Sequence, residues 1–164
     1  MIKLSSEYQP KREIRSVAGQ ILIQDLDPVN DQVSLEQIKT NRKVTEQELA
    51  DLQFAWTLCA YVKSNAIAIV KNQTLLASGA GQMSRIDSVE VALHKAKVHE
   101  HDLQGAVVAS DAFFPFFDCI EVLAAAGVKA IVAPSGAKRD DEVIQKANDL
   151  GISLLHTEIR HFRH

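Results

Sequence analysis

Cysteine and long apolar runs are both scarce in this sequence of 164 residues. Its two cysteines, Cys59 and Cys119, each stand alone in an apolar or mixed helical pattern, which favours buried structural thiols over catalysis or disulfide pairing. No stretch approaches the ~20 consecutive apolar residues of a membrane-spanning helix, and the first residues resemble no signal peptide. We therefore expect a cytoplasmic protein without a membrane partner.

A strong charge of either sign is also missing. Lys and Arg total 18 against 21 Asp and Glu, a net charge of −3, which argues against a general nucleic-acid binder. His99 and His101 have no third or fourth ligand at a convincing spacing, so no metal is expected. The length predicts one domain, over residues 14–164, preceded by a flexible N-terminus at residues 1–13.

Aromatic residues make up only 5% of the chain, yet four of the six Phe lie in one stretch, SDAFFPFFD, at residues 110–118. Its pattern predicts a strand end followed by a helix over Pro115–Ala126, with Pro115 in the first turn. We expect Phe114 to lie in the core. Phe116 and Phe117 are expected to pack that helix against the sheet.

Short apolar runs alternate with helical periods along the rest of the chain. Thr45 and Glu48 form a capping box, which predicts a helix from Thr45 to about Lys63. Ile21–Ile23 is predicted as a strand, and Asn30–Lys43 as an irregular connector or a short edge strand. Further strands are predicted at 66–70, 74–78, 106–109, 130–133 and 152–156, and further helices at 84–98 and 140–150. This order predicts an α/β layered fold, with a largely parallel or mixed sheet flanked by helices.

Ligands of such sheets bind beyond the carboxyl ends of the strands. That rule selects the loops Gly79–Arg85, Ser110–Asp118 and Pro134–Asp140, and the tail after the last strand. Each loop could also be an ordinary turn or a solvated loop, and the basic tail could be disordered. A cation in the first turn of a helix is disfavoured by the helix dipole, so Arg85 more plausibly serves an anion or a partner.

The motifs in these loops carry a resemblance to a known family. KSNAI (63–67), GAGQMSR (79–85), SDAFFPF (110–116), PSG (134–136) and RHFRH (160–164) occur in that order. Together they closely resemble the C-terminal part of the AICAR formyltransferase/IMP cyclohydrolase family of bifunctional purine biosynthesis proteins. The resemblance covers nearly the whole chain from about Ile14 and implies a cytidine-deaminase-like subdomain of the transformylase region.

The resemblance also implies site residues. Asn65, Phe113 and Arg160 match contacts to the AICAR nucleotide, with Asn65 as a substrate orienter and Arg160 suited to an anionic group. Positions that match the pocket for the co-substrate 10-formyltetrahydrofolate are Arg85, Ile86, Asp118, Ala137 and Lys138. The family uses no metal.

One feature of the family is missing. Its formyl transfer depends on an adjacent Lys-His pair in the first transformylase subdomain, and this sequence contains no Lys-His dipeptide. The resemblance therefore implies part of an AICAR formyltransferase of IMP biosynthesis, which needs a complementary subunit or domain and is inactive alone. The family's shared active site implies a homodimer or a complex with that subunit. The alternatives are a non-catalytic folate- or purine-nucleotide-binding module and a remnant kept for an interaction.

Overall fold

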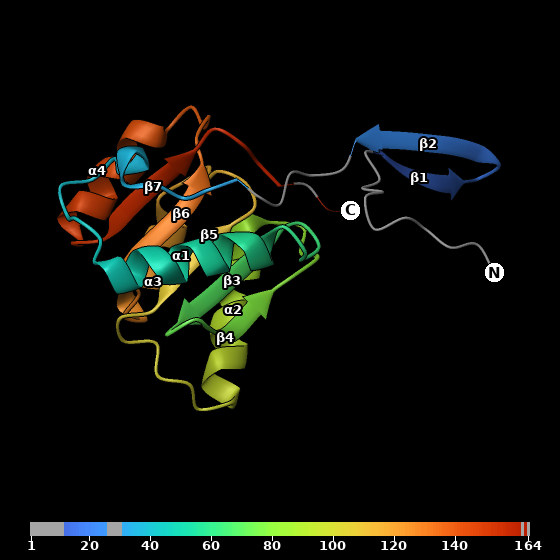
Figure 1. The fold of residues 1–164 in the computed structure, drawn as a ribbon. Coiled ribbons are helices and arrows are strands. Elements are labelled where there is room, and N and C mark those ends of the chain that lie inside the picture. The colour runs from blue at the N-terminus through green and yellow to red at the C-terminus, as the bar shows by residue number, and fades with distance from the viewer. Residues whose placement is uncertain (1–11, 26–30, 162, 164) are drawn as a thin grey trace.

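A computed structural model gives the structure of residues 12–25, 31–161 and 163. Most of the expected flexible N-terminus lies outside these described residues, as do Phe162 and His164 of the tail. The described chain forms an α/β body and a separate β-hairpin (Figure 1).

The body is built on a five-stranded mixed sheet in the order β4-β3-β5-β6-β7. These strands span Ile67–Lys71 (β3), Thr74–Gly79 (β4), Val107–Ser110 (β5), Ala130–Pro134 (β6) and Ser153–Thr157 (β7). β5, β6 and β7 run parallel, whereas β3 pairs antiparallel with both β4 and β5. The expected fold class and the five predicted strands of the body are confirmed, with small shifts at their ends.

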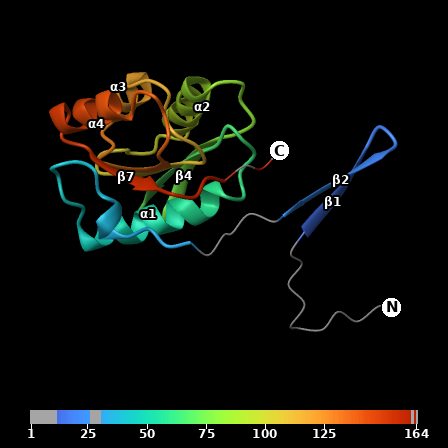
Figure 2. The same ribbon diagram turned by 90° about the horizontal axis from the view of Figure 1, so that it is seen from above.

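Helices cover both faces of this sheet (Figure 2). The helices α2 (Arg85–Val98), α3 (Asp118–Ala125) and α4 (Asp140–Asp149) lie on one face, and α1 (Glu46–Cys59) lies on the other. Alternate residues of β3 serve the two layers, since Ile69 packs in the cluster under α2–α4 and Ala68 packs in the cluster that holds Trp56 of α1. The strands are therefore buried on both faces, which explains their nearly continuous apolar sequences.

Local sequence signals explain where α1 begins. The Thr45 side chain accepts a hydrogen bond from the Glu48 N–H at 3.1 Å, and Glu48 accepts one from the Thr45 N–H at 2.8 Å. This is the capping box expected from the sequence, and it satisfies two N–H groups that would otherwise lack partners. The helix ends at Cys59, earlier than the expected Lys63.

The helix predicted over Pro115–Ala126 is shorter than expected. It begins at Asp118, with Phe117 as its N-cap, so placing Pro115 in its first turn was wrong. Phe114 is buried in the core while its neighbours Phe113 and Pro115 are exposed, and the chain reaches its helical conformation only after this turn. Phe114 and Phe117 pack in or against the core as expected.

The expectation that Phe116 packs beneath the helix was also wrong. Half of its surface is exposed, and the guanidinium of Arg139 lies 5.2 Å from its ring centroid.

The hairpin pairs β1 (Arg12–Val17) with β2 (Gln20–Asp25) and lies apart from the body in both views (Figures 1 and 2). It contains the strand predicted around Ile21–Ile23. In the connector, residues 31–43 hold a 3₁₀ turn at Leu35–Gln37 and an isolated bridge from Ile38 to Leu155. Among the described residues, no helix has the length and apolarity needed to cross a membrane.

Candidate functional site

Three of the four chain segments selected from the sequence meet at one pocket of about 360 Å³. The register explains this meeting, because Ile67 at the start of β3 pairs with Gly79 at the end of β4 and with Ser110 at the end of β5. The segment before β3 and the loops after β4 and β5 are thereby brought together, and the tail after β7 joins them. The pocket is lined by Asn65, Met83, Ser84, Arg85, Ala112, Phe113, Pro115 and Arg160.

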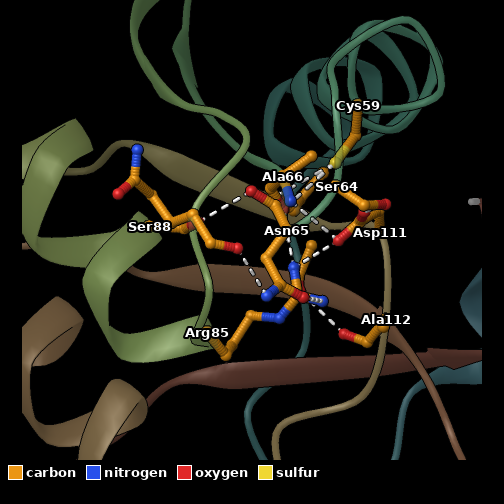
Figure 3. A network of polar contacts seen from close by, with 11 residues as sticks. Cys59, Ser64, Asn65, Ala66, Arg85, Ser88, Asp111 and Ala112 are labelled. Carbon is orange, nitrogen blue, oxygen red and sulfur yellow. Dashed lines mark hydrogen bonds and ion pairs between the residues drawn. The ribbon is translucent and has the colours of Figure 1, made fainter. Parts of the chain in front are cut away.

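The side-chain amide of Asn65 is held at both ends (Figure 3). Its Nδ2 donates to the Gln82 carbonyl at 2.9 Å, and its Oδ1 accepts from Arg85 Nη2 at 2.8 Å. A primary amide offers two N–H donors and an oxygen with two acceptor positions. Within the described chain, one N–H and one acceptor position of Asn65 are therefore left for a ligand, in a fixed orientation.

Arg85 is the first residue of α2, and its side chain turns into the protein. Its Nη1 donates to the Ala66 carbonyl at 3.0 Å and forms an ion pair with Asp111. The sequence predicted an anion or a partner for this cation, and the Asp111 carboxylate of the same chain supplies an anion. Arg85 lines the pocket, but its guanidinium is engaged with protein groups.

Asp111, which was not selected from the sequence, joins Ser64, Ala66 and Arg85 in this network (Figure 3). Its side chain is 1% exposed and accepts hydrogen bonds from the Ser64 hydroxyl, the Ala66 N–H at 3.0 Å and Arg85. A signal was present in the sequence, since an Asp directly after a buried strand faces a large desolvation cost unless it is paired.

The C-terminal tail is fixed to the body through His161. The His161 N–H donates to the Asp111 carbonyl at 3.1 Å, and its buried imidazole lies 4.3 Å from the Trp56 ring. Asp31 lies 3.7 Å from His161 Nε2 and also accepts a 2.5 Å hydrogen bond from Trp56 Nε1. This anchor, which sequence reasoning also missed, places the exposed Arg160 at the pocket. Phe162, the apolar residue of the tail, lies outside the described residues.

The remaining residues that the resemblance assigns to folate lie outside the lining of this pocket. Ile86 packs against the core, and Lys138 is exposed. Asp118 Oδ1 accepts from the Cys119 N–H, and the Ala137 N–H donates to Asp140. Their assignment to 10-formyltetrahydrofolate stays a prediction.

Gly79 has a packing role between β4 and α2. A Cβ at this position would lie 1.9 Å from the Ser88 carbonyl oxygen, so α2 can pack on β4 only if residue 79 has no side chain. Gly81 has a φ of +67° with open space around it, and its N–H donates to the Lys63 carbonyl. It supplies the positive φ that this turn requires.

Neither cysteine offers a nucleophile. Burial, reinforced by the charge of Asp111 and partly opposed by Arg85, raises the pKa of the Cys59 thiol well above its ordinary value. Burial, with a further contribution from Asp118, raises the pKa of Cys119 to about 12. Both thiols are buried and remain protonated at neutral pH. The described residues contain no cluster of three or more His, Cys, Asp or Glu side chains arranged to hold a metal ion.

A second, polar pocket of about 490 Å³ lies at the carboxyl ends of β6 and β7. His156 lines it beside Lys39 and Ser135. Burial lowers the pKa of His156, against the opposing charge of Asp140. The imidazole is therefore neutral at physiological pH.

Sequence comparison decides the family. The family model described as the AICARFT/IMPCHase bienzyme matches residues 1–95, more than half of the chain. The chain belongs to this bienzyme family.

Curated members of the family include bifunctional purine biosynthesis proteins PurH. The protein from Synechocystis sp. is 47% identical over 155 residues, and the one from Streptococcus agalactiae is 49% identical over 152 residues. These matches cover 94% and 93% of this chain. The chain spans about 30% of the length of these relatives.

Solved structures with a similar arrangement are deaminases. The apo dCMP deaminase of cyanophage S-TIM5 has a TM-score of 0.45 at 21% identity, over 70% of this chain and 99% of the deaminase. A second similar structure comes from Thermotoga maritima and is a diaminohydroxyphosphoribosylaminopyrimidine deaminase/5-amino-6-(5-phosphoribosylamino)uracil reductase. Its TM-score is 0.43 at 19% identity, over 65% of this chain and 34% of the Thermotoga maritima protein. These likenesses concern the fold alone.

Proposed function

We propose that this chain forms part of an AICAR formyltransferase of purine (IMP) biosynthesis. In this proposal the pocket binds the AICAR nucleotide and the chain contributes to formyl transfer from 10-formyltetrahydrofolate. The observation that carries it is the meeting of Asn65, Phe113 and Arg160 at one pocket. The resemblance matches these residues to nucleotide contacts from three separate motifs. Residues this far apart in the sequence would not be expected to line one pocket by chance.

The chemistry of the three side chains suits such a ligand. Arg160 presents a planar guanidinium, which can bind a phosphate through two parallel hydrogen bonds. Phe113 lines the pocket, is 36% exposed, and has an aromatic ring that offers an apolar face to a heterocycle. The fixed amide of Asn65 offers one donor and one acceptor to the polar groups of the base.

The proposal also defines what this chain does not supply. The lone pair of the aminoimidazole amine is delocalised into the ring and carboxamide, so its attack on a formyl carbon needs a proton acceptor and a cation near the developing oxyanion. Asn65 can orient the amine but cannot accept a proton. The acceptor therefore comes from a complementary domain or polypeptide that carries a Lys-His pair.

Formyl transfer from 10-formyltetrahydrofolate to AICAR tests this division of labour. The assay uses the wild-type chain alone, and then mixed with a separately expressed segment of a relative that contains the Lys-His pair. Activity is expected only in the mixture, and its loss with Arg160→Ala but not with Arg12→Ala would tie it to the pocket. Arg12 is a suitable control because it lies on the hairpin, paired with Asp25.

A non-catalytic folate- or nucleotide-binding module is the second candidate, favoured by the lack of a Lys-His pair in the sequence. Binding of AICAR nucleotide or folate without activity in any mixture would support it. IMP cyclohydrolase activity of the chain alone would instead assign it to the other reaction of the bienzyme and refute the proposal.

A further inference from the structure

Asp111 is a buried carboxylate with no assigned role, and it contacts residues that flank or hold two of the expected nucleotide residues, Asn65 and Arg160. Its side chain binds the Ser64 hydroxyl, the Ala66 N–H and Arg85, which surround Asn65. We propose that Asp111 is a positioning residue, which fixes the orientation of the Asn65 amide through Arg85. This inference rests on the proposed function only where it concerns nucleotide affinity.

The first step of the argument is the geometry of Arg85. Nη1 of the guanidinium pairs with Asp111, and Nη2 donates to Asn65 Oδ1 at 2.8 Å. Because the guanidinium is planar and rigid, fixing Nη1 on the carboxylate also fixes the direction of Nη2. Asp111 therefore sets which way the oxygen of Asn65 points without touching its side chain.

The second step is the backbone on either side of Asn65. Asp111 Oδ1 accepts from the Ala66 N–H at 3.0 Å, and the Asp111 N–H donates to the Ala66 carbonyl at 3.3 Å. The other carboxylate oxygen accepts from the hydroxyl of Ser64. The residues before and after Asn65 are thus both bound to one carboxylate, which limits how far the Asn65 backbone can move.

The third step concerns burial. The side chains of Arg85 and Asp111 are 6% and 1% exposed. Removing one member of a buried ion pair leaves the other charge without compensation, a large cost. Arg85 will therefore leave its position when Asp111 loses its charge, and the hydrogen bond to Asn65 will be lost with it.

The main chain of Asp111 extends the same support to the tail, since its carbonyl accepts from the His161 N–H at 3.1 Å, next to Arg160. Phe113 follows two residues later in the chain. A side-chain substitution leaves that carbonyl in place, so the two roles of Asp111 can be separated by experiment.

The test compares Asp111→Asn with a matched control, Asp51→Asn, in the full chain. Asp51 is also a buried carboxylate, 3% exposed, but it binds the N–H groups of Asn72 and Gln73 in the β3–β4 turn, at the opposite end of β3. Both substitutions keep the shape of the side chain and remove its negative charge. Both are expected to lower thermal stability, so stability is not the deciding measurement.

The deciding measurement is the NMR signal of the Asn65 side-chain amide, assigned by its absence in Asn65→Ala. In the wild type and in Asp51→Asn the two Nδ2 proton resonances should be distinct, and the proton that binds the Gln82 carbonyl should be protected from solvent exchange. In Asp111→Asn they should move toward the values of an exposed asparagine and exchange faster. Unchanged Asn65 resonances in Asp111→Asn, or the same change in Asp51→Asn, would overturn the proposal whether or not AICAR binds.

Affinity for AICAR nucleotide, measured by calorimetry, gives a second readout. Asp111→Asn should bind roughly tenfold or more weakly, while Asp51→Asn keeps the wild-type affinity. If Asp111 acts through Asn65, combining Asp111→Asn with Asn65→Ala should weaken binding no further than Asn65→Ala alone. Fully additive losses would contradict that route. A wild-type chain that does not bind AICAR would refute the proposed function and leave the NMR result to decide this inference.

Discussion

Arg85 donates a hydrogen bond to Asn65 Oδ1 at 2.8 Å while the same guanidinium is paired with Asp111. One side chain thus links a buried carboxylate to an amide at the edge of a pocket. The arrangement explains why a cation is placed in the first turn of α2, where the helix dipole disfavours it. The anion that compensates Arg85 is part of the fold, and the amide it orients faces the ligand site.

Replacing Arg85 by Lys should separate the effect of its positive charge from that of its planar guanidinium. A Lys ammonium can pair with Asp111, but it lacks the planar fork that reaches Asn65 at the same time. We expect AICAR nucleotide affinity to fall roughly tenfold in calorimetry, because the Asn65 oxygen loses its fixed direction. Arg85→Ala, which leaves Asp111 buried and unpaired, should in addition unfold at a clearly lower temperature. Wild-type affinity in Arg85→Lys would contradict the orienting role.

Substitution of two adjacent phenylalanines by alanine should have contrasting effects on stability and on nucleotide binding. Phe114 is 3% exposed in the core, so Phe114→Ala should lower the free energy of unfolding by about 3–5 kcal/mol. Phe113 is 36% exposed and lines the pocket, so Phe113→Ala should leave stability nearly unchanged and weaken nucleotide binding. Urea unfolding and calorimetric titration of both variants measure this contrast. Equal effects of the two substitutions on stability would count against the position of Phe113.

The charge of Arg160 should matter most for a ligand that carries a phosphate. Arg160→Ala is expected to weaken binding of the AICAR nucleotide roughly tenfold to hundredfold, since hydrogen bonds to charged groups are among the strongest. The corresponding nucleoside, which has no phosphate, should lose much less. Arg12→Ala on the hairpin is the matched control for loss of one positive charge. An equal loss for nucleotide and nucleoside would place the phosphate elsewhere.

Stability should depend on pH through His156. Burial lowers the pKa of His156 in the folded state, so the unfolded chain binds a proton more readily. Its contribution to stability is therefore complete above the unfolded pKa of about 6.5 and is lost as the pH falls through the folded pKa. Asp140 and Lys39 are the nearby charges.

Urea unfolding at pH 7.5 and 5.0 measures this effect. The wild type should lose more stability over that range than His156→Gln, whereas His94→Gln, at an exposed position of α2, should behave as the wild type. An identical pH dependence for the wild type and His156→Gln would show that His156 does not titrate in this way.

Features set by neighbouring residues could be predicted from the sequence. The capping box of Thr45 and Glu48 and the nearly continuous apolar strands depend on residues a few positions apart. The site depends on long-range pairing: Ala66 and Asp111 are 45 residues apart and meet because β3 pairs with β5. Periodicity carries no information on such pairing. It therefore could not reveal that Asp111 forms an ion pair with Arg85 or that His161 anchors the tail.

An NMR titration of the wild-type chain with AICAR nucleotide tests the central claim most directly. If the pocket binds the nucleotide, the largest shifts should occur at the Asn65 side-chain amide and at the backbone amides of Phe113 and Arg160. Asn65→Ala should weaken the response, and Arg12→Ala should not. A saturable response centred instead on the second pocket around Lys39 and His156, or no response at millimolar nucleotide, would contradict the account.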